Sequence, residues 1–298
     1  MTTVLGRVTG IAWLVVIGCG SSSAAEVDVY LLGGQSNMQG IGKLADLPAA
    51  VAREPADTFF WNGKAFEPLV VGTTRTSNRP GEFGPEIGLA TALPEAGRGR
   101  YLVKYAASGM PLHHGWNAAT WVGDPPGPKR RTFYPGEGPD DPNQGTLYRE
   151  MLTRFRAAIT SLRERGETPV VRGFAWMQGE ADAKHERSAT DYAVSLRRLR
   201  DRLAADLGVE SLPFVFGQVL PHEPAMARFT HRHEIRAGMA AADERSGRPE
   251  AIPDARMVST DGFGLLPDTV HYDAAGQVAL GRAFAEALQV IDAQTEGR

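Results

Sequence analysis

The sequence predicts an α/β protein in which a mainly parallel sheet of five strands is covered by helices on both faces. Two observations support this prediction. Short segments of the chain are apolar on both faces, and between them lie longer segments in which apolar residues recur every three or four positions, as in a helix. Strands without a polar side belong to parallel sheets, whose two faces are both buried. The regular alternation of the two kinds of segment favours one α/β domain over residues 26–298.

The five expected strands are apolar segments that end at glycines, polar residues or turns. In chain order they are Val27–Leu32, Tyr101–Ala106, Val170–Met177, Phe214–Val219 and a weaker segment, Met257–Thr260. Ligands of parallel α/β sheets bind beyond the carboxyl ends of the strands. Residues directly after these segments are therefore the first candidates for a functional site.

Long helices are expected where apolar residues recur every three or four positions. Their apolar faces are Leu147, Met151, Phe155, Ile159 and Leu162 in 146–166; Tyr192, Leu196, Leu199, Leu203 and Leu207 in 190–208; and Leu280, Phe284, Leu288 and Ile291 after the candidate cap Asp273. Glu86 is expected in the first turn of another helix, where the helix dipole favours a carboxylate. Segment 121–145, rich in Pro and Gly, is expected either to line the site or to be mobile.

Composition excludes several classes of protein. The 298 residues are 42% hydrophobic and 22% charged, which fits a globular protein and not a disordered or collagen-like chain. The 32 Lys and Arg residues against 35 Asp and Glu give a net charge of −3 without a basic run, so no nucleic-acid partner is expected. The single cysteine, Cys19, excludes an internal disulfide and a thiolate metal cluster.

Residues 1–25 have the pattern of an export signal. Arg7 precedes the apolar segment Ile11–Ile17, which is too short to span a bilayer. Val16–Cys19 resembles the bacterial lipobox, in which the cysteine is lipidated, whereas Ser23–Ala25 suits an ordinary signal peptidase. The position of the only cysteine favours the lipobox. Either route predicts an exported protein: periplasmic, held at the cell surface by a lipid on Cys19, or secreted.

Ser36 lies in a glycine turn directly after the first expected strand. The glycines allow a sharp turn that presents the serine at the edge of the sheet. Asn37 and Met38 follow the serine, so the turn is not a G-x-S-x-G elbow. The nearby Gly40–Lys43 is not a phosphate loop, because Leu44 replaces the hydroxyl residue that holds Mg²⁺. Taken alone, the turn fits either a nucleophile or an ordinary polar turn.

Asp268 and His271 lie just before the last expected helix. A carboxylate three residues before a histidine can bond its Nδ1 and leave Nε2 free to take a proton from a hydroxyl. A surface Asp–His pair is the alternative interpretation. The position of the pair, after Pro267 and directly before a helix, favours the catalytic one.

Polar residues and a glycine also follow the second and third strands of the pattern. Gly109 follows the second and offers a backbone N–H, while Gln178 follows the third and offers an amide. Glu180 and Asp182 come next. A glycosidase pair must be separated across a sugar, so two neighbouring carboxylates are expected instead to orient other groups.

Four sequence motifs, in this order, resemble those of the SGNH hydrolases: GGQSNMQG, the Gly109 turn followed by Trp116, WMQGEAD and DTVHYDAAG. Within that superfamily the resemblance is to the sialic-acid-specific acetylesterases, carbohydrate esterase family six, and covers roughly residues 27–290. It implies a single three-layer α/β/α domain of flavodoxin-like architecture, in agreement with the pattern of strands and helices.

The resemblance also implies a role for each motif. Ser36 would be the nucleophile, His271 the general base and Asp268 its orienting partner. The oxyanion hole would consist of the N–H groups of Ser36 and Gly109 together with Gln178, which stands where the superfamily usually has a shorter asparagine. Residues expected to contact the substrate are Gln35, Asn37, His113, Trp116 and Glu180.

These expectations describe a serine esterase that removes O-acetyl groups from carbohydrate through an acetyl-serine intermediate, without a metal or organic cofactor. Sialate and an acetylated polysaccharide such as xylan are both open as substrates. Two alternatives stand beside it: a catalytically silent carbohydrate-binding relative, and a lipase or thioesterase of the same superfamily. The intact Ser36, Asp268 and His271 argue against the silent relative.

Overall fold

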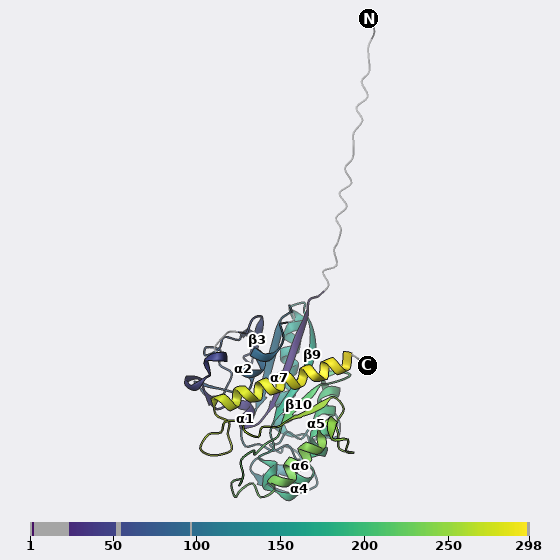
Figure 1. The fold of residues 1–298 in the computed structure, drawn as a ribbon. Helices are drawn as coiled ribbons and strands as arrows, with labels where there is room; N and C mark the ends of the chain where they lie inside the picture. The colour runs from purple at the N-terminus through teal and green to yellow at the C-terminus, as the bar shows by residue number, and fades with distance from the viewer. Residues whose placement is uncertain (1, 3–23, 52–54, 96, 297–298) are drawn as a thin grey trace.

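A seven-stranded sheet forms the centre of the structure, a computed structural model that describes residues 2, 24–51, 55–95 and 97–296 (Figure 1). The strand order is β11-β10-β9-β1-β6-β3-β4, and all neighbours are parallel except β3 and β4. These strands are β1 (Glu26–Gly34), β3 (Thr58–Trp61), β4 (Phe66–Pro68), β6 (Arg100–Ala106), β9 (Thr168–Met177), β10 (Phe214–Gly217) and β11 (Ala255–Val258). Two small antiparallel pairs are β2 (Gly42–Lys43) with β5 (Glu82–Phe83), and β7 (Trp116–Asn117) with β8 (Thr120–Trp121).

The predicted fold class is confirmed, but the predicted number of strands is wrong. The five expected strands correspond to β1, β6, β9, β10 and β11, and the hairpin of β3 and β4 extends the sheet at one edge. In its turn, Asn62 Oδ1 accepts the N–H groups of Lys64 and Ala65, and Gly63 has a φ of +106°. Asn-Gly is a strong hairpin signal, but strands of three and four residues are too short to show a period.

The helices alternate with the strands as the sequence predicts. They are α1 (Ser36–Gln39), α2 (Glu86–Ala92), α3 (Thr146–Glu164), α4 (Glu186–Thr190), α5 (Tyr192–Leu207), α6 (Arg232–Ala242) and α7 (Ala274–Glu296), with short 3-10 turns at Leu44–Asp46, Ala49–Val51, Asp182–Lys184 and Glu244–Ser246. Glu86 is the first residue of α2, as expected. No helix in the described part of the chain has the length and hydropathy needed to cross a membrane.

Helices cover both faces of the sheet and make three layers. On one face α7 packs against α2, and Figure 1 shows α7 crossing the strands. A Cβ on Gly173 of β9 would meet Leu288 of α7 at 2.3 Å. The next residue, Phe174, points to the opposite face, where its ring packs against Phe155 of α3. α5 contacts α3 on that second face.

The helix ends follow signals in the sequence. Asp273 accepts the N–H of Gly276 at 2.8 Å, as an N-cap side chain does, and α7 begins at Ala274. α5 ends at Gly208 in the left-handed conformation. These local signals fix where α7 starts, and therefore where the loop that precedes it stands.

The topology places the expected site residues at one edge of the sheet. β1 lies between β6 and β9; the chain first builds the sheet on the β6 side and later on the β9 side. The carboxyl ends of these three strands meet at the switch point where α/β sheets bind ligands. The export signal predicted for residues 1–25, including Cys19, falls almost entirely outside the described residues.

Candidate active site

The turn that carries Ser36 depends on a glycine at the end of β1. Gly34 has a φ of +151°, and a Cβ there would lie 2.1 Å from the carbonyl oxygen of Met177, at the end of β9. Gln35 donates its N–H to that same carbonyl at 2.9 Å. Only glycine lets the two strand ends approach this closely. The chain then enters α1 with Ser36 as its first residue.

Ser36, His271 and Asp268 form a continuous chain of hydrogen bonds. Ser36 Oγ lies 2.9 Å from Nε2 of His271, and Nδ1 of the same ring lies 2.5 Å from Oδ2 of Asp268. The serine follows the first strand, whereas the histidine is 235 residues later in the chain. An imidazole held between a carboxylate and a hydroxyl can accept the hydroxyl proton. The structure thus brings together the three residues that the sequence singled out.

The loop before α7 is folded around the Asp268 carboxylate. Its Oδ1 accepts the N–H groups of Val270 and His271, both at 2.9 Å. Thr269 between them has a φ of +59°, which is uncommon for a β-branched residue and closes the tight turn. Partial burial raises the pKa of Asp268. The hydrogen bonds from the His271 ring and the two N–H groups lower it by more than burial raises it, so the pKa lies below its ordinary value. Asp268 is therefore ionised at neutral pH.

A cavity of about 370 Å³ opens at Ser36, and Gly109, Glu180 and His271 also line it. As the first residue of α1, Ser36 has no i−4 carbonyl within the helix for its N–H. Gly109 has a φ of +71° with nothing within 4 Å of where a Cβ would lie, so the left-handed backbone, not crowding, requires glycine there. The N–H groups of Ser36 and Gly109 are thus two candidate donors on the wall of one cavity.

Gln178 does not lie where its expected role in the oxyanion hole requires it. Its side chain is fully buried and does not line the cavity. Nε2 donates to Asp182 Oδ2 at 2.6 Å and to the carbonyl of Met110 at 3.2 Å, while Oε1 accepts the hydroxyl of Tyr192 at 2.8 Å. Because protein acceptors occupy both amide hydrogens, this geometry does not support Gln178 as an oxyanion donor. It holds the segment around Met110 in place.

Asn37 and Glu180, both expected to contact substrate, join the parts of the site to one another. Asn37 Nδ2 donates to Glu180 Oε1 at 2.7 Å and to the carbonyl of Val270 at 3.0 Å, and its Oδ1 accepts the N–H of Tyr272 at 3.1 Å. The Ser36 turn and the His271 loop are therefore held by one side chain. Burial raises the pKa of Glu180 above its ordinary value, against the opposing effect of hydrogen bonds from its own N–H and from Asn37.

Asp182 orients the loop that carries Gly109, in agreement with the orienting role expected for this pair of carboxylates. It is fully buried and accepts the N–H groups of Leu112 at 2.8 Å and His113 at 3.0 Å. Burial raises the pKa of Asp182 to about 6, although the hydrogen bonds it accepts act in the opposite direction. The side chain of Gln35, another expected substrate contact, is held by a hydrogen bond, since its Oε1 accepts the N–H of Ala181 at 3.3 Å.

The expected substrate contacts of His113 and Trp116 are not supported by the structure. Neither residue lines the Ser36 cavity, and both are buried. Trp116 donates its indole N–H to Ser188 Oγ at 3.1 Å and packs edge-on against Trp121. Trp116 is thus fixed by a residue 72 positions later in the chain, a contact that the sequence pattern cannot show.

One group among the described residues has the composition of a metal site: the ligand atoms of His113, His114 and Asp124 lie within 4.8 Å of one another. However, His113 Nδ1 accepts the N–H of Gly115 at 2.9 Å, which leaves the proton of the neutral ring on Nε2. That Nε2 faces Oδ2 of Asp191 at 3.4 Å. Burial and the neighbouring His114 ring lower the pKa of His113 to about 4. A neutral ring with this tautomer has its one ring-nitrogen lone pair, on Nδ1, already engaged by the N–H of Gly115.

A buried ion pair beneath α1 was not anticipated from the sequence. Lys104, in the middle of β6, contacts Glu86 at 2.6 Å and donates to the carbonyl of Gln39, the last residue of α1, at 3.0 Å. Glu86 also accepts the N–H of Gly84 at 2.8 Å. The available signal was a lysine inside an otherwise apolar strand, because a charge is buried in such a place only with a partner.

Comparisons with known proteins give one family match and several solved structures with a similar fold. Residues 26–290 match the family model described as carbohydrate esterase, sialic acid-specific acetylesterase. A solved protein from Arabidopsis thaliana is 18% identical, with a TM-score of 0.65 over 89% of this chain and 98% of its own. NanS is 14% identical, with a TM-score of 0.58 over 91% and 99%. A carbohydrate acetylesterase from Xanthomonas citri is 20% identical, with a TM-score of 0.54 over 89% and 56%. No curated protein matches the sequence.

Proposed function

Because this chain belongs to the carbohydrate esterase family of sialic acid-specific acetylesterases, we propose that it removes O-acetyl groups from carbohydrate by means of a serine nucleophile. The observation that supports the serine mechanism is the 2.9 Å contact between Ser36 Oγ and His271 Nε2, in a chain that continues to Asp268. A silent binding protein has no need of this arrangement.

The first half of the reaction transfers the acetyl group to the protein. A neutral hydroxyl is a weak nucleophile, so His271 takes the Ser36 proton as Oγ attacks the acetyl carbonyl, and Asp268 stabilises the resulting imidazolium. Negative charge develops on the carbonyl oxygen, where the N–H groups of Ser36 and Gly109 donate to it; each such donor contributes about 3 kcal/mol. His271 then protonates the sugar oxygen as the C–O bond to the acetyl group breaks.

The second half restores the enzyme. His271 removes a proton from a water molecule, which attacks the acetyl-serine carbonyl and forms the same kind of oxyanion. When the intermediate collapses, Ser36 Oγ leaves with the proton from His271 and acetate is released. The same base, His271, and the same oxyanion hole, formed by the N–H groups of Ser36 and Gly109, serve both halves of the reaction.

The decisive experiment measures acetate release by wild type and Ser36→Ala. We expect the variant to lose at least about 10³-fold in kcat on p-nitrophenyl acetate and on acetylated sugars, with an unchanged melting temperature. Ser211→Ala, which removes an exposed hydroxyl, is the matched control. Activity of Ser36→Ala within tenfold of wild type would refute the nucleophile. Faster turnover of long-chain esters than of acetate esters would favour the lipase or thioesterase alternative.

We also propose that the protein is exported, with or without a lipid on Cys19. The support for this proposal is the sequence of residues 1–25: a positive start, a short apolar segment and two candidate processing sites. An extracellular location suits the polysaccharide alternative in particular, because such polymers do not enter cells.

A further inference from the structure

The two N–H groups of the proposed oxyanion hole come from different parts of the chain, so their spacing depends on contacts between those parts. The N–H of Ser36 belongs to the first residue of α1, and the N–H of Gly109 belongs to the turn that follows β6. An oxyanion hole is effective when its donors lie about 2.7–3.1 Å from the developing charge. A hydrogen bond that fixes the Gly109 turn relative to α1 therefore bears on the rate of the reaction.

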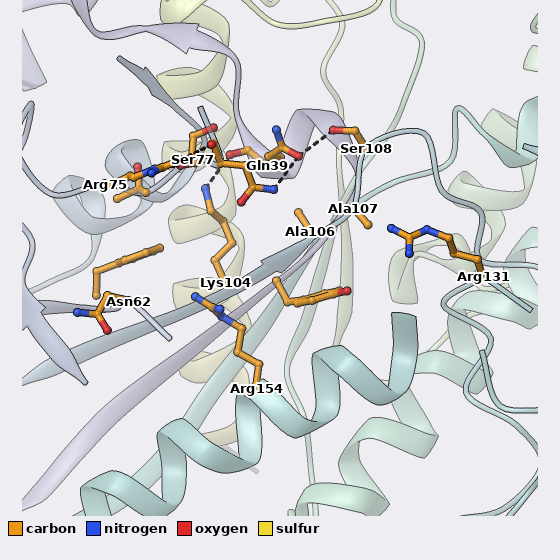
Figure 2. A pocket seen from close by; sticks show the side chains of 14 residues that line it. Gln39, Asn62, Arg75, Ser77, Lys104, Ala106, Ala107, Ser108, Arg131 and Arg154 are labelled. Atoms are coloured by element: carbon orange, nitrogen blue, oxygen red, sulfur yellow. Dashed lines mark hydrogen bonds between the residues drawn. The ribbon is translucent and has the colours of Figure 1, made fainter. Parts of the chain in front are cut away.

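The side chain directly before Gly109 makes such a bond. Ser108 donates its hydroxyl to Oε1 of Gln39 at 2.9 Å. Gln39 is the last residue of α1, the short helix that begins at Ser36. Figure 2 shows the bond as a dashed line between the two side chains. It connects the residue next to one oxyanion donor with the helix that carries the other donor.

The backbone of the Gly109 turn is held at its start but not packed at its tip. Ala107 donates its N–H to the carbonyl of Gly34 at 3.0 Å, and Met110 closes the turn by donating to the carbonyl of Ala107 at 3.3 Å. Ser108 and Gly109 are the two central residues, and the φ of +71° at Gly109 is typical of a type II turn. A Cβ on Gly109 would meet nothing within 4 Å, so side-chain packing does not fix the tip.

The segment after the turn is held by a different element. Gln178, directly after β9, donates to the carbonyl of Met110, and Asp182 accepts the N–H groups of Leu112 and His113. In the sheet, β9 lies on the opposite side of β1 from β6. These bonds connect the turn to the loop after β9, whereas the bond made by the Ser108 side chain connects it to α1.

Gln39 is a rigid acceptor, because both its backbone and its side chain are held. The residue is buried; its N–H donates to the carbonyl of Gln35 at 2.7 Å, and its carbonyl accepts Nζ of Lys104 at 3.0 Å. Its Oε1 also accepts Nδ2 of Asn78 at 3.2 Å, so two donors occupy the two lone pairs of this oxygen. An acceptor fixed in this way gives the Ser108 hydroxyl a defined position.

Ser108 lies where two cavities meet. It lines the Ser36 cavity and also a neighbouring cavity of about 680 Å³, whose lining is drawn in Figure 2. The residue is exposed, but a hydroxyl has one hydrogen, and here that hydrogen is donated to Gln39. In this geometry the hydroxyl has no hydrogen to donate to a substrate oxyanion. Its effect on the reaction then passes through the neighbouring Gly109.

Resting on the serine esterase mechanism proposed above, we propose that Ser108 is a positioning residue, whose bond to Gln39 sets the place of the Gly109 N–H relative to the Ser36 N–H. Removing the bond would leave the turn closed by its own backbone bond, so that the oxyanion hole is loosened and not lost. We expect a loss of about five- to tenfold in rate, the factor that one neutral hydrogen bond contributes.

The test measures how tightly the protein forms a tetrahedral adduct. The hydroxyl of Ser36 adds to the carbonyl of 1,1,1-trifluoroacetone, its proton passes to His271, and the adduct places an oxyanion in the hole. ¹⁹F NMR gives the dissociation constant of the adduct, and kcat/KM is measured on p-nitrophenyl acetate. We expect Ser108→Ala and Gln39→Met each to weaken the adduct about five- to tenfold and to lower kcat/KM by the same factor.

Two further variants and a double variant separate positioning from a general effect on the fold. Ser108→Thr keeps the hydroxyl and should stay within about twofold of wild type, as should the exposed-hydroxyl control Ser211→Ala. Ser108→Ala/Gln39→Met should lose no more than the larger single loss, because the same bond is absent in all three proteins. Melting temperatures should stay unchanged in the Ser108 variants.

The outcomes distinguish this inference from the proposed function. Adducts as tight as in wild type in both Ser108→Ala and Gln39→Met would overturn the positioning role. A loss in Ser108→Ala alone would also overturn it, because the hydroxyl would then act on the substrate directly. A wild type that forms the adduct but releases no acetate from sugars would overturn the acetylesterase, while the adducts of the variants still decide the positioning role. A wild type without any adduct would refute the serine mechanism and the positioning role together.

Discussion

Asp268 sets the tautomer of the catalytic imidazole. In Asp268→Asn, an amide N–H would face Nδ1 of His271, so that Nδ1 becomes an acceptor and the ring proton moves to Nε2. That nitrogen could no longer take the Ser36 proton. We expect kcat to fall about 10³- to 10⁴-fold with little change in KM or melting temperature, measured by acetate release and thermal unfolding. A variant within tenfold of wild type would show that the carboxylate has no such role.

The Asp182 carboxyl should make stability depend on pH. Its pKa is about 6 in the folded protein, against an ordinary value of 3.8, so the folded state binds more protons between these values. The stability it contributes is therefore fully present below pH 3.8 and is lost as pH rises through 6, with a decline on the order of 2 kcal/mol between pH 4 and pH 6. Asp182→Asn does not titrate, so the difference in unfolding free energy between wild type and variant should shrink from pH 4 to pH 7.

Urea unfolding at several pH values measures this difference. Asp140→Asn, which removes an exposed carboxylate, is the control and should leave the pH dependence as in wild type. A wild-type to Asp182→Asn difference that is constant from pH 4 to pH 7 would contradict the raised pKa. Asp182→Asn should also lower kcat, because Asp182 accepts two N–H groups of the segment that follows Gly109.

Single site residues are predictable from the sequence where the chemistry is local. Asp268 and His271 are three residues apart, so their contact follows from one turn of chain. The direction of a side chain is another matter. Gln178 turns toward Asp182 and toward the carbonyl of Met110, 68 residues away, and no spacing in the sequence encodes that second partner.

At the scale of elements, the pair of Lys104 and Glu86 connects β6, α2 and α1. Lys104→Met would leave the fully buried Glu86 carboxylate without its cation and the Gln39 carbonyl without its donor. We expect a loss of about 3–5 kcal/mol in unfolding free energy, measured with urea. The double variant Lys104→Met/Glu86→Gln should regain part of it, because the unpaired charge is then absent.

Lys64→Met is the control for this measurement, since it removes an exposed lysine from the hairpin turn. A Lys104→Met protein as stable as wild type would mean that Glu86 finds another way to be accommodated, and the pair would then have no structural role.

Elements with a clear period were predictable, and short ones were not. The apolar faces of α3 and α7 and the cap Asp273 appear in the structure where the sequence placed them, because each depends on neighbours within a few turns. β3 depends instead on pairing with β6, which the chain reaches about forty residues later, and β4 depends on pairing with β3. Their hydrogen bonds across the sheet edge, rather than a period of their own, stabilise them.

For the whole molecule, the export proposal predicts a shortened chain. Mass spectrometry of the protein purified from its native host should find either a lipidated Cys19 or a free N-terminus at Glu26, depending on which processing site is used. A Cys19→Ser variant separates the two, because only the first route is blocked by it. A mature protein that still begins at Met1 would refute export by either route.

The central position of β1 has a consequence for how the enzyme meets its substrate. The described fold begins with this strand at Glu26. The strand has nine extended residues, so its other end, next to Ser36, lies about 30 Å from Glu26. A protein attached to a membrane or a bead through its N-terminal end would therefore hold the Ser36 cavity on the side away from the attachment. Immobilisation by this end should leave even bulky polysaccharides free to dock.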